Sequence, residues 1–308
     1  MLMTTTTRNV SISSWLADGL AAQVAAFFRG RDARTFSLVG GAVVLWASWP
    51  TLATVAYPAP PFLVLGLAAL VGFALSFCLM AVRGRARSFW SVSPATLIFV
   101  AFGLMGNNAF YLAAISRIGP AEANVVHYLW PIFLVILSAF VVRRAPTPVQ
   151  VVGIACGFSG VAVALSPQMG AGFDAVGVLL GISGALTFAV YSVGRSLAKV
   201  ETNVVGPSLG LAGAGALAVH VLTEPVYALS ATQWGAIALM GLGPFTLANI
   251  LWDRATRQGA AATISSLAFL TPLVALSLLV VFGLSTLTLQ LVVGAVLTIA
   301  GAVLGTRR

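Results

Sequence analysis

Apolar stretches of about 20 residues, separated by short polar breaks, recur along the chain from residue 37 onward. A helix of about 20 apolar residues is long enough to cross the hydrocarbon core of a bilayer. The pattern therefore predicts an all-α integral membrane protein. We place ten transmembrane helices at residues 37–57, 61–82, 94–116, 122–142, 148–166, 175–194, 203–222, 232–252, 259–281 and 284–305.

The first 36 residues show a different pattern. A polar start precedes a short amphipathic segment in which Leu16, Leu20, Val24 and Phe27 recur at helical spacing. A secretory signal would carry its charge before an apolar core and end in a small-residue cleavage site, and this segment has neither. We interpret residues 1–36 as a cytoplasmic tail or a helix in the membrane interface, with a poorly ordered tail as the alternative.

Composition supports a membrane protein and narrows its chemistry. Hydrophobic residues make up 59% of the chain and charged residues only 7%, against about 25% charged in an ordinary globular domain. The net charge of +9 is spread too thinly for a nucleic-acid surface. Cys78 and Cys156 sit in apolar runs, so we expect small buried side chains and no disulfide, metal site or cofactor.

Basic residues test the helix pattern independently, because Lys and Arg collect in cytoplasmic loops. With the N-terminus inside, all 16 Lys and Arg except Arg117 fall in predicted cytoplasmic segments. One miscounted helix would scramble this distribution. We therefore predict ten spans with the N- and C-termini both cytoplasmic.

The two halves of the chain resemble each other. Positions 141 residues apart match repeatedly: Gly160 with Gly301, Asn108 with Asn249, and Pro131 with Pro272. A constant offset indicates an internal repeat, which we divide into residues 37–166 and 175–305. Each unit holds five helices, an odd number, so the second must enter the membrane from the opposite side. Such inverted repeats are typical of secondary transporters, which bind substrate near the midplane between the repeats.

The segment Glu122 to Pro131 concentrates polar and aromatic side chains inside an apolar run: Asn124, His127, Tyr128 and Trp130. Polar groups are costly in lipid and usually face the interior of a bundle or a cavity. We therefore expect this segment to line a substrate cavity. For His127 the alternative is a histidine satisfied by a neighbouring hydroxyl.

Other helices supply side chains that would suit a small zwitterionic ligand. Amide and hydroxyl groups can bind its charged ends, and aromatic faces attract an ammonium group. The alternatives are interhelical hydrogen bonding for the two asparagines and membrane-interface positions for aromatic residues near span ends. Our candidate substrate-binding residues are Trp46, Asn108, His127, Tyr128, Trp130, Phe188, Tyr191, Asn249 and Ser265, with Asn124, Ser266, Trp49, Tyr111 and Trp252 nearby.

Two prolines suggest moving parts. A proline within a helix removes one backbone hydrogen bond and crowds the carbonyl four residues earlier. We expect Pro131 and Pro272 to kink their helices beside the cavity and to act as paired hinges.

Several short sequences carry a resemblance to a known family. They are Leu45-Trp46-Ala47-Ser48 in the first span, Ile118-Gly119-Pro120-Ala121 and Gln258-Gly259-Ala260-Ala261 before the proline-bearing spans, and the WP and TP pairs at Trp130-Pro131 and Thr271-Pro272. With ten spans in two halves, the chain resembles the EamA-type drug/metabolite transporter superfamily. Its HYLWP run is similar to that of bacterial aromatic amino acid exporters, where we expect Asn-Tyr-Leu-Trp-Pro; this chain departs from it at His127.

The resemblance implies export of aromatic and other neutral amino acids across the bacterial inner membrane by alternating access, with the bilayer and a small molecule as the binding partners. The alternative within transporters is an exporter of organic cations or other small metabolites. An intramembrane enzyme is disfavoured because the chain has no HExxH and no Gly-x-Ser-x-Gly. A channel would differ from a transporter in showing flux that does not saturate.

Acidic residues bear on the coupling of transport to protons. Glu122, Asp174 and Glu224 fall near predicted outer span ends and Asp253 near an inner one, which favours facilitated efflux over obligatory proton antiport. Glu122 and His127 are the plausible proton carriers, and His220 sits alone in an apolar run.

Small residues bear on assembly. Glycines of the fifth and tenth spans, Gly153, Gly157, Gly160, Gly294 and Gly301, permit close helix contact. They predict an internal seam, with a dimer face as the alternative, and hence a monomer or a weak dimer.

Overall fold

The computed structural model describes residues 31–143, 145–167, 174–197, 204–258 and 270–305, and every regular element in these ranges is a helix. Eight helical stretches are long and apolar enough to cross a membrane, and two shorter apolar helices cover Thr271–Val281 and Leu289–Gly305. The predicted N-terminal tail up to residue 30 and the first half of the predicted ninth span lie outside the described residues.

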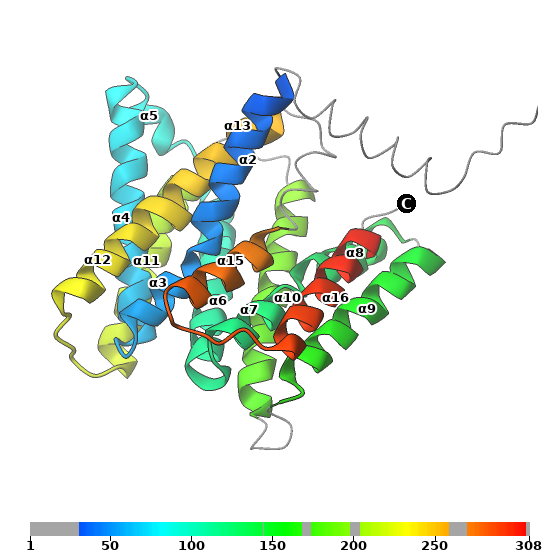
Figure 1. The fold of residues 1–308 in the computed structure, drawn as a ribbon. Coiled ribbons are helices and arrows are strands. Elements are labelled where there is room, and N and C mark those ends of the chain that lie inside the picture. The colour runs from blue at the N-terminus through cyan, green and yellow to red at the C-terminus, as the bar shows by residue number, and fades with distance from the viewer. Residues whose placement is uncertain (1–30, 144, 168–173, 198–203, 259–269, 306–308) are drawn as a thin grey trace, which may run out of the picture.

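The helices follow the predicted spans closely (Figure 1). In chain order they are α2 (Arg31–Ala47), α3 (Trp49–Ala56), α4 (Pro61–Val82), α5 (Ala86–Phe89), α6 (Pro94–Ile118), α7 (Pro120–His127), α8 (Trp130–Val142), α9 (Pro148–Leu165), α10 (Ala175–Leu197), α11 (Val205–Thr223), α12 (Ala231–Met240), the π-helix η1 (Gly241–Leu247), α13 (Ala248–Gln258), α15 (Thr271–Val281) and α16 (Leu289–Gly305).

Three predicted spans are each broken into shorter segments. The first breaks at Ser48, between α2 and α3, and the fourth at Tyr128 and Leu129, between α7 and α8. The eighth changes to a π-helix around Pro244. Proline lies at all three, and its ring removes a backbone donor; at the first two breaks it also occupies the first turn of the following helix, a position that proline favours. Pro50 lies in the first turn of α3 and Pro131 in that of α8.

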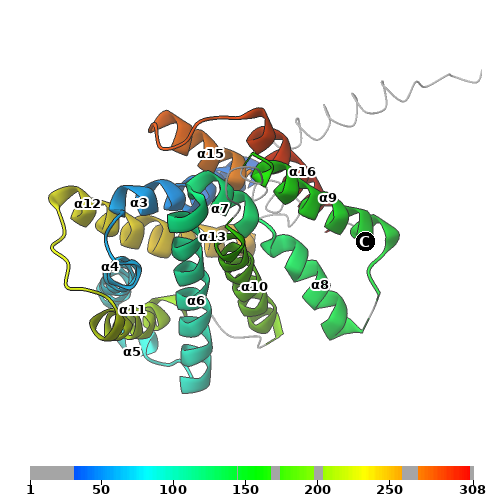
Figure 2. The same ribbon diagram turned by 90° about the horizontal axis from the view of Figure 1, so that it is seen from below.

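Close backbone contact joins α9 to α16, which lie side by side at one edge of the molecule (Figure 1, Figure 2). A Cβ atom on Gly301 would lie 2.5 Å from the carbonyl oxygen of Gly153, and one on Gly160 would lie 2.6 Å from that of Gly294. Only glycine permits this approach. The prediction of an internal seam between the fifth and tenth spans is confirmed.

Polar contacts tie together helix ends that the sequence predicts to lie on the outer side. The Glu224 carboxylate accepts hydrogen bonds from the backbone N–H groups of Phe62 and Leu63, at 3.0 and 3.2 Å, at the start of α4. Arg117, in the last turn of α6, pairs with Asp174, directly before α10, at 2.8 Å. The expectation that His220 stands alone is wrong, because its Nδ1 lies 2.8 Å from the Glu224 carboxylate, one helical turn away.

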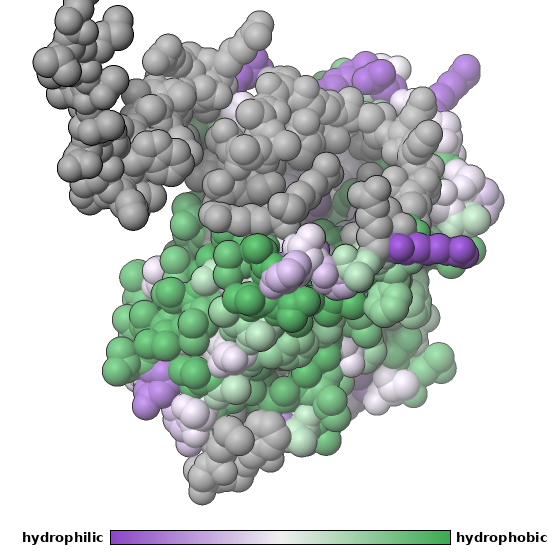
Figure 3. Space-filling view, turned by 90° about the vertical axis from the view of Figure 1, so that its right-hand side faces the viewer, coloured by the Kyte–Doolittle hydropathy of each residue, from purple (hydrophilic) through white to green (hydrophobic). Residues whose placement is uncertain are grey.

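The described surface over α8, α9 and α16 is mainly apolar (Figure 3). Phe140, Val152 and Val296 on these helices are 76%, 54% and 50% exposed. In water, an exposed apolar patch of this kind would promote aggregation. Facing lipid tails, the same side chains are stable.

Candidate substrate site

A polar cluster joins α6 to α7 at the segment that the sequence singled out. Nε2 of His127 lies within hydrogen-bond distance of Oδ1 of Asn107, at 2.7 Å. The ring of Tyr111 stacks on the imidazole with centroids 4.5 Å apart. The Tyr111 hydroxyl donates to Oδ1 of Asn124 at 3.2 Å. Four side chains from two helices thus contact one another through two hydrogen bonds and one ring stack.

Helical spacing explains why these residues meet. Asn107 and Tyr111 are four residues apart on α6, and Asn124 and His127 three apart on α7, so each pair shares one face of its helix. Gly119, with φ of 86°, turns the chain sharply between the two helices. The two polar faces are thereby brought together.

A third helix closes over this cluster because it carries glycine at the contact. A Cβ atom on Gly184 of α10 would lie 3.2 Å from the Asn107 carbonyl oxygen and 3.5 Å from Cδ2 of His127. The imidazole therefore lies between α6, α7 and α10.

An aromatic row starts beside the break between α7 and α8. Trp130 meets Phe188 edge to face with centroids 5.0 Å apart, and Phe188 lies 6.0 Å from Tyr191. Tyr128 lies 6.5 Å from Trp130, and a side-chain hydrogen bond links Tyr128 to Thr271 of α15. The structure thus brings together four of the predicted wall residues, from α8, α10 and the α7–α8 break. Phe99 of α6, 6.3 Å from Tyr191, extends the row.

Trp46 belongs to a second set of aromatic contacts, made by the first span with η1 and α13. It packs against Trp252 of α13 at 5.1 Å. In the next segment Trp49 stacks on Phe245 of η1, with centroids 5.0 Å apart and planes inclined by 28°. In the described part of the chain, no ring contact joins this group to the row around Trp130.

The repeat-related asparagines make the same local hydrogen bond. Nδ2 of Asn108 donates to the Leu104 carbonyl at 2.8 Å, and Nδ2 of Asn249 to the Phe245 carbonyl at 3.0 Å. Both bonds reach back one turn of the residue's own helix. Asn249 also donates to the Pro244 carbonyl at 3.2 Å, which satisfies backbone in the π-helix.

Sequence reasoning missed Asn107, which holds His127. The signal was available in its spacing from Tyr111, but the repeat symmetry drew attention to the adjacent Asn108. Ser265 and Ser266 lie outside the described residues. Pro272 lies in the first turn of α15, as Pro131 does in α8. The kink expected beside Pro131 takes the form of a break: α7 ends at His127, and α8 begins at Trp130 with Pro131 in its first turn.

Three buried side-chain groups have no hydrogen-bond partner among the described residues: Nε1 of Trp49, Oγ1 of Thr51 and Nδ2 of Asn124. These side chains are 6%, 5% and 3% exposed. A buried donor without an acceptor costs about 1–3 kcal/mol. The interior around α3 and α7 therefore contains buried polar groups that could bind a ligand.

Comparisons with known proteins agree with this architecture. A sequence model of the EamA-like transporter family matches residues 34–166 and again residues 175–307. The aromatic amino acid exporter YddG of Ancylobacter novellus is 31% identical over 272 residues, which cover 86% of this chain and 94% of that protein. The uncharacterized transporter YvbV of Bacillus subtilis is 26% identical, over 86% of this chain and 89% of its own length.

A solved crystal structure shares the fold. It superposes with a TM-score of 0.69 at 29% sequence identity, covering 89% of this chain and 96% of its own. Since the family's sequence model matches both halves and the exporter aligns over most of the chain, this protein belongs to the EamA-like transporter family.

Proposed function

We propose that this transporter exports aromatic and other neutral amino acids across the bacterial inner membrane. The observation that carries the proposal is the aromatic row of Trp130, Phe188 and Tyr191 beside the Asn107–His127 pair. An aromatic wall next to neutral hydrogen-bonding groups suits a ligand with a large apolar side chain and polar ends. The similarity to an aromatic amino acid exporter supports the same substrate class.

The proposed architecture is ten spans in two inverted repeats, residues 37–166 and 175–305, with both termini cytoplasmic. Two observations support it. The family's sequence model matches the two halves separately, and the contacts of Glu224 with α4 and of Arg117 with Asp174 join helix ends predicted to lie on one side.

The proposed mechanism is alternating access about the broken helices. Tyr128 and Leu129 separate α7 from α8, and Pro131 and Pro272 occupy corresponding first turns of α8 and α15. Breaks of this kind let a half-helix tilt without disturbing a continuous hydrogen-bond ladder. Substrate would enter between the repeats from one side and leave after these segments rock.

Transport driven by the substrate gradient is favoured over obligatory proton exchange. Two of the three predicted outer carboxylates are engaged at helix ends: Asp174 in an ion pair with Arg117 and a backbone hydrogen bond, and Glu224 in contacts with His220 and with backbone N–H groups. His127 forms its hydrogen bond with Asn107, an uncharged side chain. Among the described residues, this polar contact therefore places no carboxylate beside the imidazole.

The test is uptake of labelled tryptophan, phenylalanine, threonine and methionine into proteoliposomes, with and without an imposed pH gradient. We expect saturable flux that competing amino acids inhibit, that a pH gradient leaves unchanged, and that Trp130→Ala abolishes. Trp234→Phe is the matched control, because Trp234 lies at the start of α12 and is 51% exposed. Flux of a flat organic cation without amino acid flux would instead assign the protein to the export of cationic drugs.

A further inference from the structure

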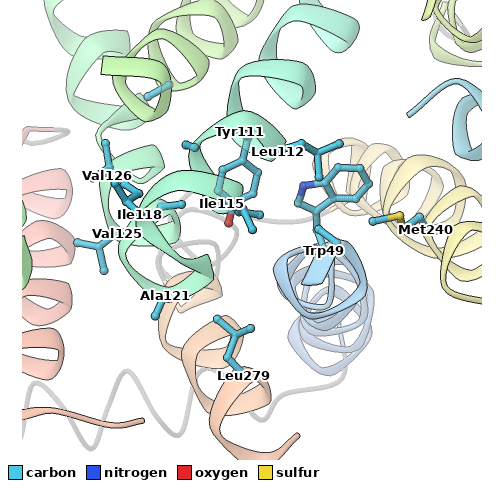
Figure 4. Packing of buried hydrophobic residues seen from close by; sticks show 14 of the residues in the cluster. Trp49, Tyr111, Leu112, Ile115, Ile118, Ala121, Val125, Val126, Met240 and Leu279 are labelled. Atoms are coloured by element: carbon cyan, nitrogen blue, oxygen red, sulfur yellow. The ribbon is translucent and has the colours of Figure 1, made fainter. Parts of the chain in front are cut away.

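Two of the unpartnered groups belong to residues beside Tyr111, namely Trp49 and Asn124. Trp49 packs beside Tyr111 and Leu112 of α6, with its indole nitrogen on the side of the ring nearer Tyr111 (Figure 4). The Tyr111 hydroxyl reaches Oδ1 of Asn124. Helix α3, which carries Trp49, contacts α7, which carries Asn124. The indole N–H and the Asn124 amide group are therefore both close to Tyr111, where α3, α6 and α7 meet.

Thr51 does not belong to this region. It follows Trp49 by two residues on α3, so its side chain leaves the helix about 200° further round. The unpartnered groups beside Tyr111 are thus N–H donors. Such donors require an acceptor, and beside the apolar side chains of Leu112 and Ile115 a charged acceptor would bind them most strongly (Figure 4).

We propose that Trp49 and Asn124 form a carboxylate subsite between α3 and α7, which the α-carboxylate of a transported amino acid occupies when these two segments part. The proposal rests on the proposed function. Both segments are eight residues long, and each adjoins a break in its span, at Ser48 and at Tyr128–Leu129. The donors lie buried and unpartnered while α3 and α7 are in contact, and they gain an acceptor as the substrate passes between them.

The test compares two competitors that differ in the carboxylate. Uptake of labelled tryptophan into proteoliposomes is measured in the presence of phenylalanine or of phenylalaninamide, which lacks the carboxylate. The inhibition by each competitor is compared for wild type, Trp49→Phe and Asn124→Leu. A hydrogen bond to a charged acceptor corresponds to about tenfold or more in affinity. Phenylalanine should therefore inhibit uptake by wild type at a concentration lower than that of phenylalaninamide by at least about that factor. In each variant the preference should fall by about tenfold.

Trp49→Phe is the decisive variant if Asn124→Leu fails to fold, because a phenyl ring preserves the stack on Phe245. Trp234→Phe, at an exposed position of α12, should keep the wild-type preference. An unchanged preference in Trp49→Phe, or equal weakening of both competitors, would overturn the subsite while leaving the proposed function intact. Absence of amino acid uptake by wild type would overturn the proposed function and the subsite with it.

Discussion

The imidazole of His127 depends on Asn107 for its hydrogen bond, whereas the neighbouring Asn108 bonds only to its own helix. These adjacent residues point about 100° apart around α6. Removing one therefore breaks an interhelical contact, and removing the other does not.

We expect Asn107→Leu to destabilise the protein by about 1 kcal/mol, a typical value for a polar contact between helices in a membrane. Asn108→Leu should have a much smaller effect, since the Leu104 carbonyl that it contacts lies within a regular helix. Thermal unfolding of the two purified variants in detergent measures the difference. Equal loss of stability would mean that the Asn107–His127 bond contributes nothing.

The residue scale is also where prediction from sequence was weakest. The polar side chains predicted between Asn124 and Trp130 do take part in a cluster, and of the predicted aromatic neighbours Phe188 meets Trp130 and Tyr191 meets Phe188. Asn107 was missed because α6 is apolar on most of its circumference, so its sequence does not show which asparagine faces α7. That choice is made by packing against α7 and α10.

At the scale of elements, glycines let the backbones of α9 and α16 approach each other closely. A Cβ atom on Gly301 would meet the backbone of Gly153 and Gly157, at 2.5 Å in each case, and backbone cannot turn aside as a side chain can. We expect Gly301→Ala to cost about 1–3 kcal/mol, the usual range for overpacking. Gly235→Ala is the control, because no atom lies within 4 Å of the added Cβ. The melting temperatures of the two variants test this prediction. A Gly301→Ala protein as stable as Gly235→Ala would rule out a tight seam.

The helices themselves were largely predictable. The span at 61–82 coincides with α4, and that at 148–166 with α9 to within one residue. Hydrophobic length and proline at the first helical position determine these boundaries. The breaks at Ser48 and around Pro244 were not predicted, because an apolar run of the right length reads as one helix whether or not proline interrupts it.

The break at Pro131 leads to a kinetic prediction. Pro131→Ala restores a backbone N–H that can donate to the His127 carbonyl and join α7 to α8. If the break is a hinge, turnover should fall several-fold while the half-saturating substrate concentration changes little. Pro148→Ala, at the capped start of α9, is the matched control. Unchanged turnover in Pro131→Ala would remove the hinge role.

At the scale of the whole molecule, the contacts at helix ends define two opposite ends of the bundle. Glu224 with Phe62, Arg117 with Asp174, and Gln233 with the Ala56 carbonyl lie at one end. Phe89 of α5 packs at the other, where a Cβ atom on Gly206 would lie 2.8 Å from its ring. The helix ends that these contacts join are ends that the basic residues predict to lie on one side of the membrane.

This arrangement can be tested by labelling single cysteines in intact cells with a thiol reagent that does not cross membranes. In a protein with Cys78 and Cys156 replaced by serine, Ala228→Cys and Thr286→Cys should react without permeabilisation, and Ser88→Cys only after it. All three positions are exposed. Thr286 is the most informative, because it joins the two shorter apolar helices α15 and α16. Its protection in intact cells would mean that the ninth predicted span does not cross, and the second repeat would then no longer be an inverted copy of the first.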